Sequence, residues 1–385
     1  MSLYEKRGVS AGKEEVHAAI RNLSSGLYSD TFCKILPDLN GHDEDYCTIM
    51  HADTAGTKSV IAYLYWKETG DLSVWKGIVQ DAIVMNLDDM ICSGASGNMI
   101  ISSTISRNKH RVPGEVLTAL IEGCRELLEE WRAFGINLHL AGGETADVGD
   151  LVRTVDVGYT AYARFPKKEV IHVNPQPGDL IVGFSSSGQS VYEKEYNSGI
   201  GCNGLTSARH DILNKEYAER YPESFDPKID PSVCYTGKYK LTDKVYTDID
   251  AGKLLLSPTR TYAPVLQEIL KTGSEEIHGI IHNTGGGQTK CMKYIGEGIR
   301  LVKDNLFEPP AIFEMIRTQS GAGLREMYQV FNMGHRMEIY TTAKRAEEMI
   351  GIAAALGIDA KVIGRVEAAP SKQLLLTGKM GTIEY

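Results

Sequence analysis

A short run of turn-forming residues near the middle of the chain, at 174–179, is the feature that most constrains how this sequence can fold. The run reads Asn-Pro-Gln-Pro-Gly-Asp and is the clearest interruption of regular structure in the sequence. At 385 residues the chain is also too long for one compact core of ordinary size. We therefore predict a domain boundary in this run, with one domain at 1–173 and a second at 179–385.

Hydrophobic periodicity predicts both helices and strands in each half of the chain. In the first half it indicates helices at 14–27, 79–94 and 112–135, and strands at 45–51, 136–140 and 152–165. In the second half it indicates helices at 258–271, 309–319 and 342–356, and strands at 180–184, 276–282, 333–341, 359–366 and 372–377. Residues 214–250 are polar and aromatic, and we expect them to form an excursion outside the core. This mixture favours an α+β (α/β) fold over a pure βαβ array.

The segment 80–92 is predicted to be a helix with an apolar stripe on one side and carboxylates on the other. At about 100° per residue, Asp81, Asp88 and Asp89 fall opposite the stripe that runs from Ile83 to Ile91. Because a methionine and a cysteine share the acidic side, we expect the helix to be buried on most of its surface. Buried carboxylates in a row repel one another and lose hydration, and a divalent cation would remove that cost. From this helix alone, a metal site and a solvated acidic face both stay open.

Two further acids lie in glycine-containing segments. Residues 141–146 (Ala-Gly-Gly-Glu-Thr-Ala) follow an apolar run, so we expect Glu144 in a glycine-paired turn whose backbone aims the carboxylate. Residues 53–58 (Asp-Thr-Ala-Gly-Thr-Lys) have a similar character. Each segment alone could be an ordinary turn or helix cap, and neither matches a familiar nucleotide-binding loop. Together, three separated acidic sites suggest Mg²⁺ held by carboxylates, with substrate phosphates completing the shell.

Two small-residue segments could bind an anion. Residues 282–287 (His-Asn-Thr-Gly-Gly-Gly) follow an apolar strand, and residues 185–188 (Ser-Ser-Ser-Gly) follow another. Glycines let a ligand approach backbone N–H groups closely, as in an anion-binding nest. A flexible connector between a strand and a helix is an equally good interpretation of each segment.

Charge and cysteine content narrow the classes of function. The net charge is −9 and no basic block stands out, which argues against nucleic acid as a main partner. No apolar run is long enough to cross a bilayer, and the N-terminus lacks the apolar region of a secretion signal, so a cytoplasmic, non-membrane protein is expected. The seven cysteines show no zinc or redox spacing and are predicted to be reduced thiols.

Taken in order, these motifs resemble the aminoimidazole ribonucleotide (AIR) synthetase family, the phosphoribosylformylglycinamidine cyclo-ligases, over nearly the whole chain. The resemblance rests on residues 4–9, 53–58, 88–89, 142–146, 255–262, 282–287 and 326–334. The acidic and first glycine motifs are shared with a wider superfamily of ATP-using enzymes, whereas the last three are more specific. The sequence departs from the family pattern at Thr54, at Asp88, in 31–44, in 192–204 and directly after the triple glycine.

The resemblance implies a fold and a reaction. The fold would have two domains, with an N-terminal sheet that forms a barrel across a homodimer near the ATP sites, and a C-terminal mixed sheet with helices. The reaction would be ATP-dependent ring closure of formylglycinamidine ribonucleotide to AIR in purine biosynthesis. ATP would phosphorylate the formyl oxygen, and an amidine nitrogen would then displace the phosphate.

The resemblance also implies roles for individual residues. The expected catalytic residues are Lys58, Asp89 and Glu144, and the expected Mg²⁺ ligands are Asp53, Asp89 and Glu144, supported by Asp81 and Asp88. The expected nucleotide contacts are Asp53, Gly56, Thr57, Lys58, Gly142, Gly143 and Thr145. The expected substrate contacts are Ser187, Gly188, Asn203, Gly204, Thr259, Arg260, Thr284, Gly285 and Gly286.

Two alternatives stay open. One is another small-molecule phosphotransferase of the superfamily, similar to thiamine monophosphate kinase or to selenophosphate synthetase. The second of these is disfavoured, because no cysteine lies in an N-terminal glycine-rich region. The other alternative is a non-catalytic nucleotide-binding paralogue. The presence of Asp53, Lys58, Asp89 and Glu144 argues against it.

Overall fold

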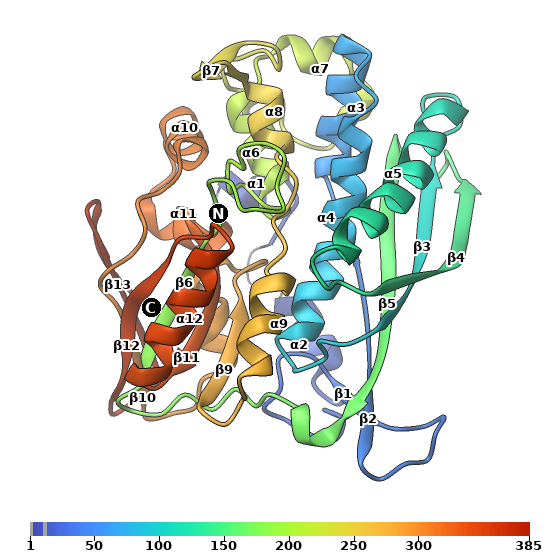
Figure 1. The fold of residues 1–385 in the computed structure, drawn as a ribbon. Helices are drawn as coiled ribbons and strands as arrows, with labels where there is room; N and C mark the ends of the chain where they lie inside the picture. The colour runs from blue at the N-terminus through green and yellow to red at the C-terminus, as the bar shows by residue number, and fades with distance from the viewer. Residues whose placement is uncertain (1–2, 11–13) are drawn as a thin grey trace.

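Two large β-sheets, with helices between and around them, form most of the described chain, and a small two-stranded sheet lies within residues 214–250 (Figure 1). The computed structural model describes residues 3–10 and 14–385. One large sheet is built from residues before 167 and the other from residues after 179, with the run at 174–179 between them. Within the described residues, no helix combines the length and the apolar character that a membrane span requires.

The N-terminal sheet has five strands in the order β1-β2-β5-β3-β4. All neighbours are antiparallel except β3 and β4, which are parallel and joined by the crossover helix α5. The strands are β1 (Ile35–Pro37), β2 (Tyr46–Thr54), β3 (Met99–Arg107), β4 (Leu138–Asp147) and β5 (Val155–Pro166). The helices that accompany them are α1 (Leu3–Lys6), α2 (Glu14–Ile20), α3 (Lys58–Thr69), α4 (Val74–Ile91) and α5 (Gly114–Arg132), with a 3₁₀ turn η1 (Lys167–Glu169).

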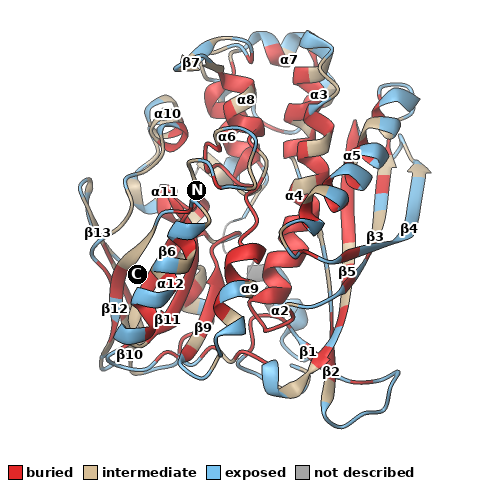
Figure 2. Cartoon of the chain, viewed as in Figure 1, coloured by how far each residue is buried: buried red, intermediate tan, exposed pale blue. Residues whose placement is uncertain are grey.

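Helix α4 lies between the two halves of the chain. It contacts β2, β5 and α5 on one side and α8 and α9 of the C-terminal half on the other. Almost every residue of α4 is buried, and the helix is red along its length in Figure 2. Burial on all sides is expected for a helix enclosed by both halves of the chain. The sequence-based expectation of a largely buried helix at 80–92 is therefore confirmed.

The other face of the N-terminal sheet is open in the single chain. Met50 and Ile100 are 65% and 48% exposed on it, and seven consecutive residues of β4, from 139 to 145, are exposed. Figure 2 shows β3 and β4 as tan and pale blue arrows with no helix over them on this side. The sheet does not close into a barrel within one chain, so the expected barrel would need a second copy.

The C-terminal sheet has seven strands in the order β14-β13-β10-β12-β6-β11-β9. Only β10 and β13 are parallel neighbours, and helix α12 lies across β6 and β12. The strands are β6 (Leu180–Ser185), β9 (Ile277–His282), β10 (Ile299–Lys303), β11 (His335–Thr341), β12 (Ala360–Ala368), β13 (Gln373–Gly378) and β14 (Gly381–Glu384). The helices are α6 (Leu205–Ile212), α8 (Ala251–Leu256), α9 (Ala263–Lys271), α10 (Ala311–Ser320), α11 (Leu324–Val330) and α12 (Ala343–Ala355), with a 3₁₀ segment η4 (Gly287–Lys293).

Residues 214–250 form short elements that pack back onto α3. They comprise α7 (Glu216–Arg220), η2 (Pro222–Ser224), η3 (Pro231–Val233), β7 (Lys244–Tyr246) and β8 (Ile249–Asp250). The hydroxyl of Tyr217 and the guanidinium of Arg220 both donate to Glu68 of α3, at 2.9 and 2.8 Å. Because Tyr217, Tyr235 and Leu241 are buried in the main hydrophobic cluster, the expectation of a segment wholly outside the core is wrong.

Two expected helices are shorter in the structure. The helix expected at 14–27 ends at Ile20; its start adjoins residues 11–13, which lie outside the described residues. The helix expected at 258–271 begins only at Ala263, because residues 257–262 form an irregular loop. That loop is held against α4 by hydrogen bonds to two of its carboxylates, and this tertiary contact overrides the local helical pattern.

Candidate active site

The acidic side of α4 faces loops from the C-terminal half of the chain. Asp81 and Asp88 are 0% exposed and Asp89 is 6% exposed. Each of the three carboxylates accepts hydrogen bonds from a different part of that half. Residues of the 257–262 loop donate to Asp81 and Asp88, and His282, at the end of the strand before the triple-glycine loop, donates to Asp89. The three acids therefore sit at the junction of the two halves.

Asp81 and Lys58 form a fully buried ion pair. The Nζ of Lys58 lies 2.8 Å from Oδ1 of Asp81, and both side chains are 0% exposed. Asp81 also accepts from the backbone N–H and the hydroxyl of Thr259, at 2.8 and 2.5 Å. Nζ of Lys58 donates further to the carbonyls of Gly201 (3.0 Å) and Ser257 (2.6 Å). An ammonium has three protons, so these contacts account for every donor that Lys58 has.

Asp88 holds the second half of the same loop. Its two oxygens accept from the Thr261 hydroxyl at 2.6 Å and from the backbone N–H of Tyr262 at 2.9 Å. Burial raises the pKa of Asp88 to about 7, because desolvation of the charged form outweighs these hydrogen bonds. Asp88 therefore keeps its proton to a higher pH than an exposed aspartate does.

Asp89 has the opposite electrostatic character. Burial opposes its ionisation, but the charge of Lys290 and the hydrogen bond from His282 outweigh burial and hold the pKa of Asp89 at about 2. Nδ1 of His282 lies 2.7 Å from Oδ1 of Asp89. Burial also lowers the pKa of His282, to about 4, so its ring is neutral. Since Nε of Arg336 donates to His282 Nε2 at 3.2 Å, the His282 proton must lie on Nδ1, facing Asp89.

The triple-glycine loop leads from β9 into η4 and packs tightly against α11. A Cβ on Gly287 would lie 2.5 Å from the carbonyl oxygens of Tyr328 and Phe331, and φ of Gly287 is +50°. Only glycine satisfies both conditions. Gly285 faces the amide of Asn203: a Cβ added to Gly285 would be 3.8 Å from Oδ1 of Asn203. Nζ of Lys290 donates to the Thr284 hydroxyl at 2.5 Å.

A buried polar network centred on Glu338 of β11 supports this loop. The carboxylate of Glu338 accepts from Lys303 at 2.6 Å, from Asn283 at 2.9 Å and from the Tyr340 hydroxyl at 2.6 Å. Burial opposes the ionisation of Glu338, but the charge of Lys303 and the hydrogen bond from His335 dominate and lower its pKa. The network fixes the strand β11 against the start of the glycine loop.

The loop at 53–58 meets the loop that precedes α6. The thiol of Cys202 donates to the carbonyl of Ala55 at 3.0 Å, and the hydroxyls of Thr57 and Thr206 lie 2.9 Å apart. Gly204, which ends the second loop, has φ +77°, and a Cβ there would lie 2.3 Å from the ring of Phe331. The expected nucleotide residues Asp53, Gly56, Thr57 and Lys58 and the expected substrate residues Asn203 and Gly204 thus belong to adjoining loops.

Arg260 is enclosed by protein groups. Its guanidinium donates twice to Glu193, with a shortest distance of 2.6 Å, and to the carbonyls of Ser185 and Ser187 at 2.9 Å each. The side chain is 0% exposed. Gly188 lies beside it: a Cβ added to Gly188 would be 4.0 Å from Nη2 of Arg260. Arg260 therefore anchors the 185–188 loop and the inserted segment around Glu193.

Glu144 does not lie in a turn, as the sequence suggested. It belongs to the edge strand β4 together with Gly142, Gly143 and Thr145, all of which are exposed. Gly143 pairs with Ser103 beside a β-bulge, where a Cβ would meet the Ser103 hydroxyl at 2.0 Å. The two glycines serve this strand irregularity, so the expectation of a glycine-paired turn is wrong.

Within one chain the structure does not bring Glu144 to the other acids. Glu144 pairs with Thr104 on β3, Thr104 pairs with Gly158 on β5, and Gly158 pairs with Thr54 on β2. These four residues therefore share one face of the sheet. Asp53 is the neighbour of Thr54 and so points to the opposite face of the sheet. Strands β5 and β3 also separate the two acids, which at about 4.8 Å per strand is ~14 Å.

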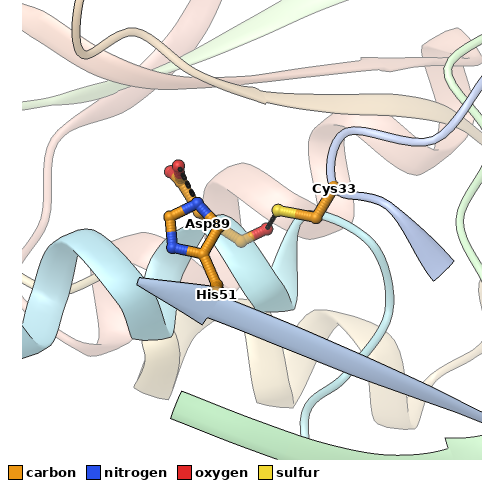
Figure 3. Close-up of side chains that lie close together, drawn as sticks. All are labelled: Cys33, His51 and Asp89. Carbon is orange, nitrogen blue, oxygen red and sulfur yellow. Dashed lines mark hydrogen bonds and ion pairs between the residues drawn. The ribbon is translucent and has the colours of Figure 1, made fainter. Parts of the chain in front are cut away.

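Several residues of the site carried no sequence signal that we recognised. His51 lies on β2 two residues before Asp53, and period-two alternation could have placed the two on one face. His282 opens the 282–287 motif named in the sequence analysis, but its contact with Asp89 was not predicted. Cys33, Glu193 and Arg336 reach the site only through tertiary packing. The three side chains Cys33, His51 and Asp89 lie together in Figure 3.

Two family models match the chain. The N-terminal domain of AIR synthase related proteins matches residues 34–164, and the C-terminal domain matches residues 176–376. A phosphoribosylformylglycinamidine cyclo-ligase of Pyrococcus furiosus is 31% identical over 310 residues, which cover 80% of this chain and 76% of that protein. The protein of the same name from Methanococcus vannielii is 29% identical over 377 residues, or 95% of this chain and 93% of that protein.

Solved structures share the fold. T. maritima PurL complexed with FGAR superposes with a TM-score of 0.56 at 13% identity over 97% of this chain, which spans 49% of the PurL chain. AaThiL complexed with AMPPCP and TMP gives 0.55 at 12% identity, covering 94% of this chain and 92% of AaThiL. This likeness confirms the expected two-domain fold class. With both halves matched by its family models, the chain belongs to the AIR synthase related protein family.

Proposed function

We propose that this chain is an ATP-dependent cyclo-ligase that closes formylglycinamidine ribonucleotide to AIR in purine biosynthesis. The observation that carries the proposal is the convergence of four motif loops, at 53–58, 201–206, 257–262 and 282–287, on one junction beside the acidic side of α4. Relatives named phosphoribosylformylglycinamidine cyclo-ligase support the reaction. No observation favours a phosphotransferase for thiamine monophosphate or selenide, or a silent paralogue.

ATP is the proposed nucleotide. AaThiL was solved with AMPPCP and T. maritima PurL with ADP, at TM-scores of 0.55 and 0.53. The buried cations Lys58 and Arg260 already have protein partners, so the triphosphate needs another counter-charge. Mg²⁺ would supply it by screening the γ-phosphoryl group, and carboxylate oxygens are the ligands that Mg²⁺ prefers. We propose that the main protein ligands of Mg²⁺ are Asp53, the partly exposed first residue of the 53–58 segment, and the ionised Asp89.

The remaining acids of α4 are proposed to act through the loops they hold. Asp88 uses both oxygens on the 257–262 loop, and Asp81 uses Oδ1 on the same loop and on Lys58. We therefore assign the two acids to positioning Thr259 and its neighbours rather than to direct metal contact. Lys58, with all its protons engaged, holds the same loop. Such positioning suits the reaction, because ring closure mainly requires that two ends of one molecule be held in reach.

The substrate is proposed to lie between the glycine loop and the loop at 201–204. Gly285 faces Asn203, with Thr284 and Gly286 on either side of it in the chain. Ser187 and Gly188 border the same junction through Arg260. In the proposed reaction the formyl oxygen attacks the γ-phosphorus of ATP and ADP leaves. The amidine nitrogen then attacks the activated carbon and phosphate leaves, which closes the imidazole ring.

A homodimer formed through the open face of the N-terminal sheet is also proposed. Met50 and Ile100 are large apolar side chains exposed to water on this face. A second copy would cover these residues and the exposed row that includes Glu144, which is how Glu144 could approach a nucleotide. Sedimentation or light scattering would give twice the monomer mass, whereas Ile100→Glu should shift the protein to monomer. The cytoplasm remains the proposed location, in keeping with seven free cysteines.

The reaction is tested by incubating the purified protein with ATP, MgCl₂ and formylglycinamidine ribonucleotide and following AIR by mass spectrometry. One ADP should appear for each AIR, and omission of MgCl₂ should stop both. Parallel incubations replace the substrate with thiamine monophosphate or selenide. Turnover of either of these without AIR formation would reject the proposal. ATP binding without any turnover would favour the silent paralogue.

A further inference from the structure

Three potential metal ligands from distant parts of the sequence meet beside the junction of the two halves. Cys33 lies just before β1, His51 lies on β2 and Asp89 on α4, as Figure 3 shows. One thiol sulfur, one imidazole nitrogen and one carboxylate oxygen lie within 4.8 Å of one another. Cys33 and Asp89 are buried and His51 is partly buried. Separations of 18 and 38 residues explain why cysteine spacing gave no hint of the cluster.

The hydrogen bonds of His51 leave one ring nitrogen aimed at the cluster. The amide of Asn86 donates through Nδ2 to the carbonyls of Ala82 and Tyr159, at 2.9 and 3.0 Å. Its Oδ1 is therefore the atom that faces Nδ1 of His51 at 3.0 Å, and Nδ1 must carry a proton. In the neutral ring, Nε2 then points a lone pair at Oδ2 of Asp89, 3.5 Å away. Two such acceptors repel unless a proton or a metal cation lies between them.

Asp89 and Cys33 are both fixed by other contacts. His282 donates to Oδ1 of Asp89 and leaves Oδ2 for the cluster. A histidine that orients a carboxylate in this way is a typical support for a metal ligand. The backbone N–H of Cys33 donates to the Ser93 hydroxyl at 2.8 Å, and its sulfur lies 3.2 Å from the carbonyl oxygen of Asp89. All three donor atoms are thus held in place without a metal.

We propose that Cys33, His51 and Asp89 bind one zinc ion, at a site separate from the phosphate-bound Mg²⁺ of the proposed reaction. Sulfur, nitrogen and oxygen donors together suit Zn²⁺, whereas Mg²⁺ takes oxygen ligands almost exclusively. Three protein ligands leave the fourth position of a tetrahedral ion to water. The proposal does not depend on the reaction, because these donors would bind zinc in the absence of ATP. Zinc would use Oδ2 of Asp89, so the two sites share this carboxylate, and Mg²⁺ would rely on Asp53 and the phosphates when zinc is bound.

The charge of the site agrees with a divalent ion. A thiolate and a carboxylate supply two negative charges. Lys290 and Lys293 are cations near Cys33, and Nζ of Lys290 lies 4.7 Å from the centre of the neighbouring Phe32 ring. Burial raises the pKa of the Cys33 thiol, and Lys290 lowers it to a smaller extent. Zinc binding must therefore release the thiol proton, and the affinity should increase with pH.

The test uses the untagged full chain, stripped with a chelator and free of nucleotide. Zinc is added, excess metal is removed, and bound metal is counted by elemental analysis. One zinc per chain is expected. Replacement of zinc by Co²⁺ should give an intense thiolate charge-transfer absorption and the visible bands of four-coordinate cobalt. Affinities of wild type, Cys33→Ser and His51→Gln are compared by competition with a chromogenic chelator. Each substitution should weaken zinc binding by about 100-fold or more.

Control variants separate the site from general thiol binding. Cys124→Ser removes another buried cysteine, on α5, and should bind zinc as wild type does. Circular dichroism must show that all variants are folded. If wild type takes up no zinc, or if cobalt shows no thiolate absorption, the proposal is overturned. It is also overturned if Cys33→Ser binds as tightly as Cys124→Ser. A protonated His51 paired with Asp89 would then explain the geometry, and NMR of the His51 ring would show it.

Discussion

Replacing Lys58 by methionine would test whether one buried ion pair joins the two halves of the chain. Methionine keeps much of the volume of lysine but removes its charge and its three donors. Lys58 is the first residue of α3, yet it bonds to Asp81 of α4 and to the carbonyls of Gly201 and Ser257 in the C-terminal half. The substitution therefore removes contacts on both sides of the junction at once.

The expected cost follows from the burial of the pair. Both side chains are 0% exposed, so water cannot replace the lost partner. Removing one member of a buried pair typically destabilises a protein by about 3–5 kcal/mol, because the other charge is left uncompensated. Here Asp81 would keep only the two hydrogen bonds from Thr259. Adding Asp81→Asn removes the unpaired charge. The free energy of unfolding of the double variant should therefore exceed that of Lys58→Met alone by ~1–3 kcal/mol.

Urea unfolding followed by circular dichroism measures the free energy of unfolding of wild type, both single variants and the double variant. Hydrogen exchange at residues 257–262 adds a local measurement, and exchange there should speed up in Lys58→Met. Lys67→Met serves as the control, because Lys67 is an exposed lysine of the same helix; it should change stability by less than about 0.5 kcal/mol. A loss below ~1 kcal/mol for Lys58→Met, or no recovery in the double variant, would refute the reasoning.

Three further predictions concern the same junction. Asp89→Asn should lower ring-closure turnover by about 100-fold or more with an unchanged circular dichroism spectrum, and wild-type turnover would contradict its role. Burial raises the pKa of Asp88 to about 7, so the folded chain holds this proton more tightly than the unfolded chain. Wild type should therefore lose up to about 4 kcal/mol relative to Asp88→Asn as pH rises from ~4 to ~7; parallel stability curves from urea unfolding would exclude this. Gly287→Ala should cost ~1–3 kcal/mol in the same assay, whereas Gly296→Ala, whose Cβ would meet nothing within 4 Å, should be neutral.

The sequence contained enough information to predict the mixed fold and the burial of α4. Both follow from local patterns: the two-residue and 3.6-residue periods set strands and helices, and apolar residues on the acidic side exclude a solvated helix. Motif order was sufficient to assign the family. The gathering of the motif loops at one junction followed from that assignment and not from any local pattern.

The sequence did not reveal which way individual side chains point within the sheet. Gly142, Gly143 and Glu144 look like a turn because glycines are common in turns, but here Gly143 accommodates a bulge opposite Ser103. A shift of one residue in register moves a side chain to the other face, so Glu144 could not be placed without knowing how β3 and β4 pair. Cys33 and His51 were missed because contacts between distant segments leave no spacing in the sequence.

The row of carboxylates on α4 works as a set of acceptors that align the second half of the chain. Asp81, Asp88 and Asp89 each hold a different segment, at Thr259, at Thr261 with Tyr262, and at His282. Asp88 is a position where the sequence departs from the family pattern, and burial keeps that carboxyl largely neutral below pH 7. Both of its oxygens contact the loop, at Thr261 and at Tyr262. Asp89, by contrast, stays ionised beside Lys290 and His282, and it is the position where a permanent negative charge can face a metal ion.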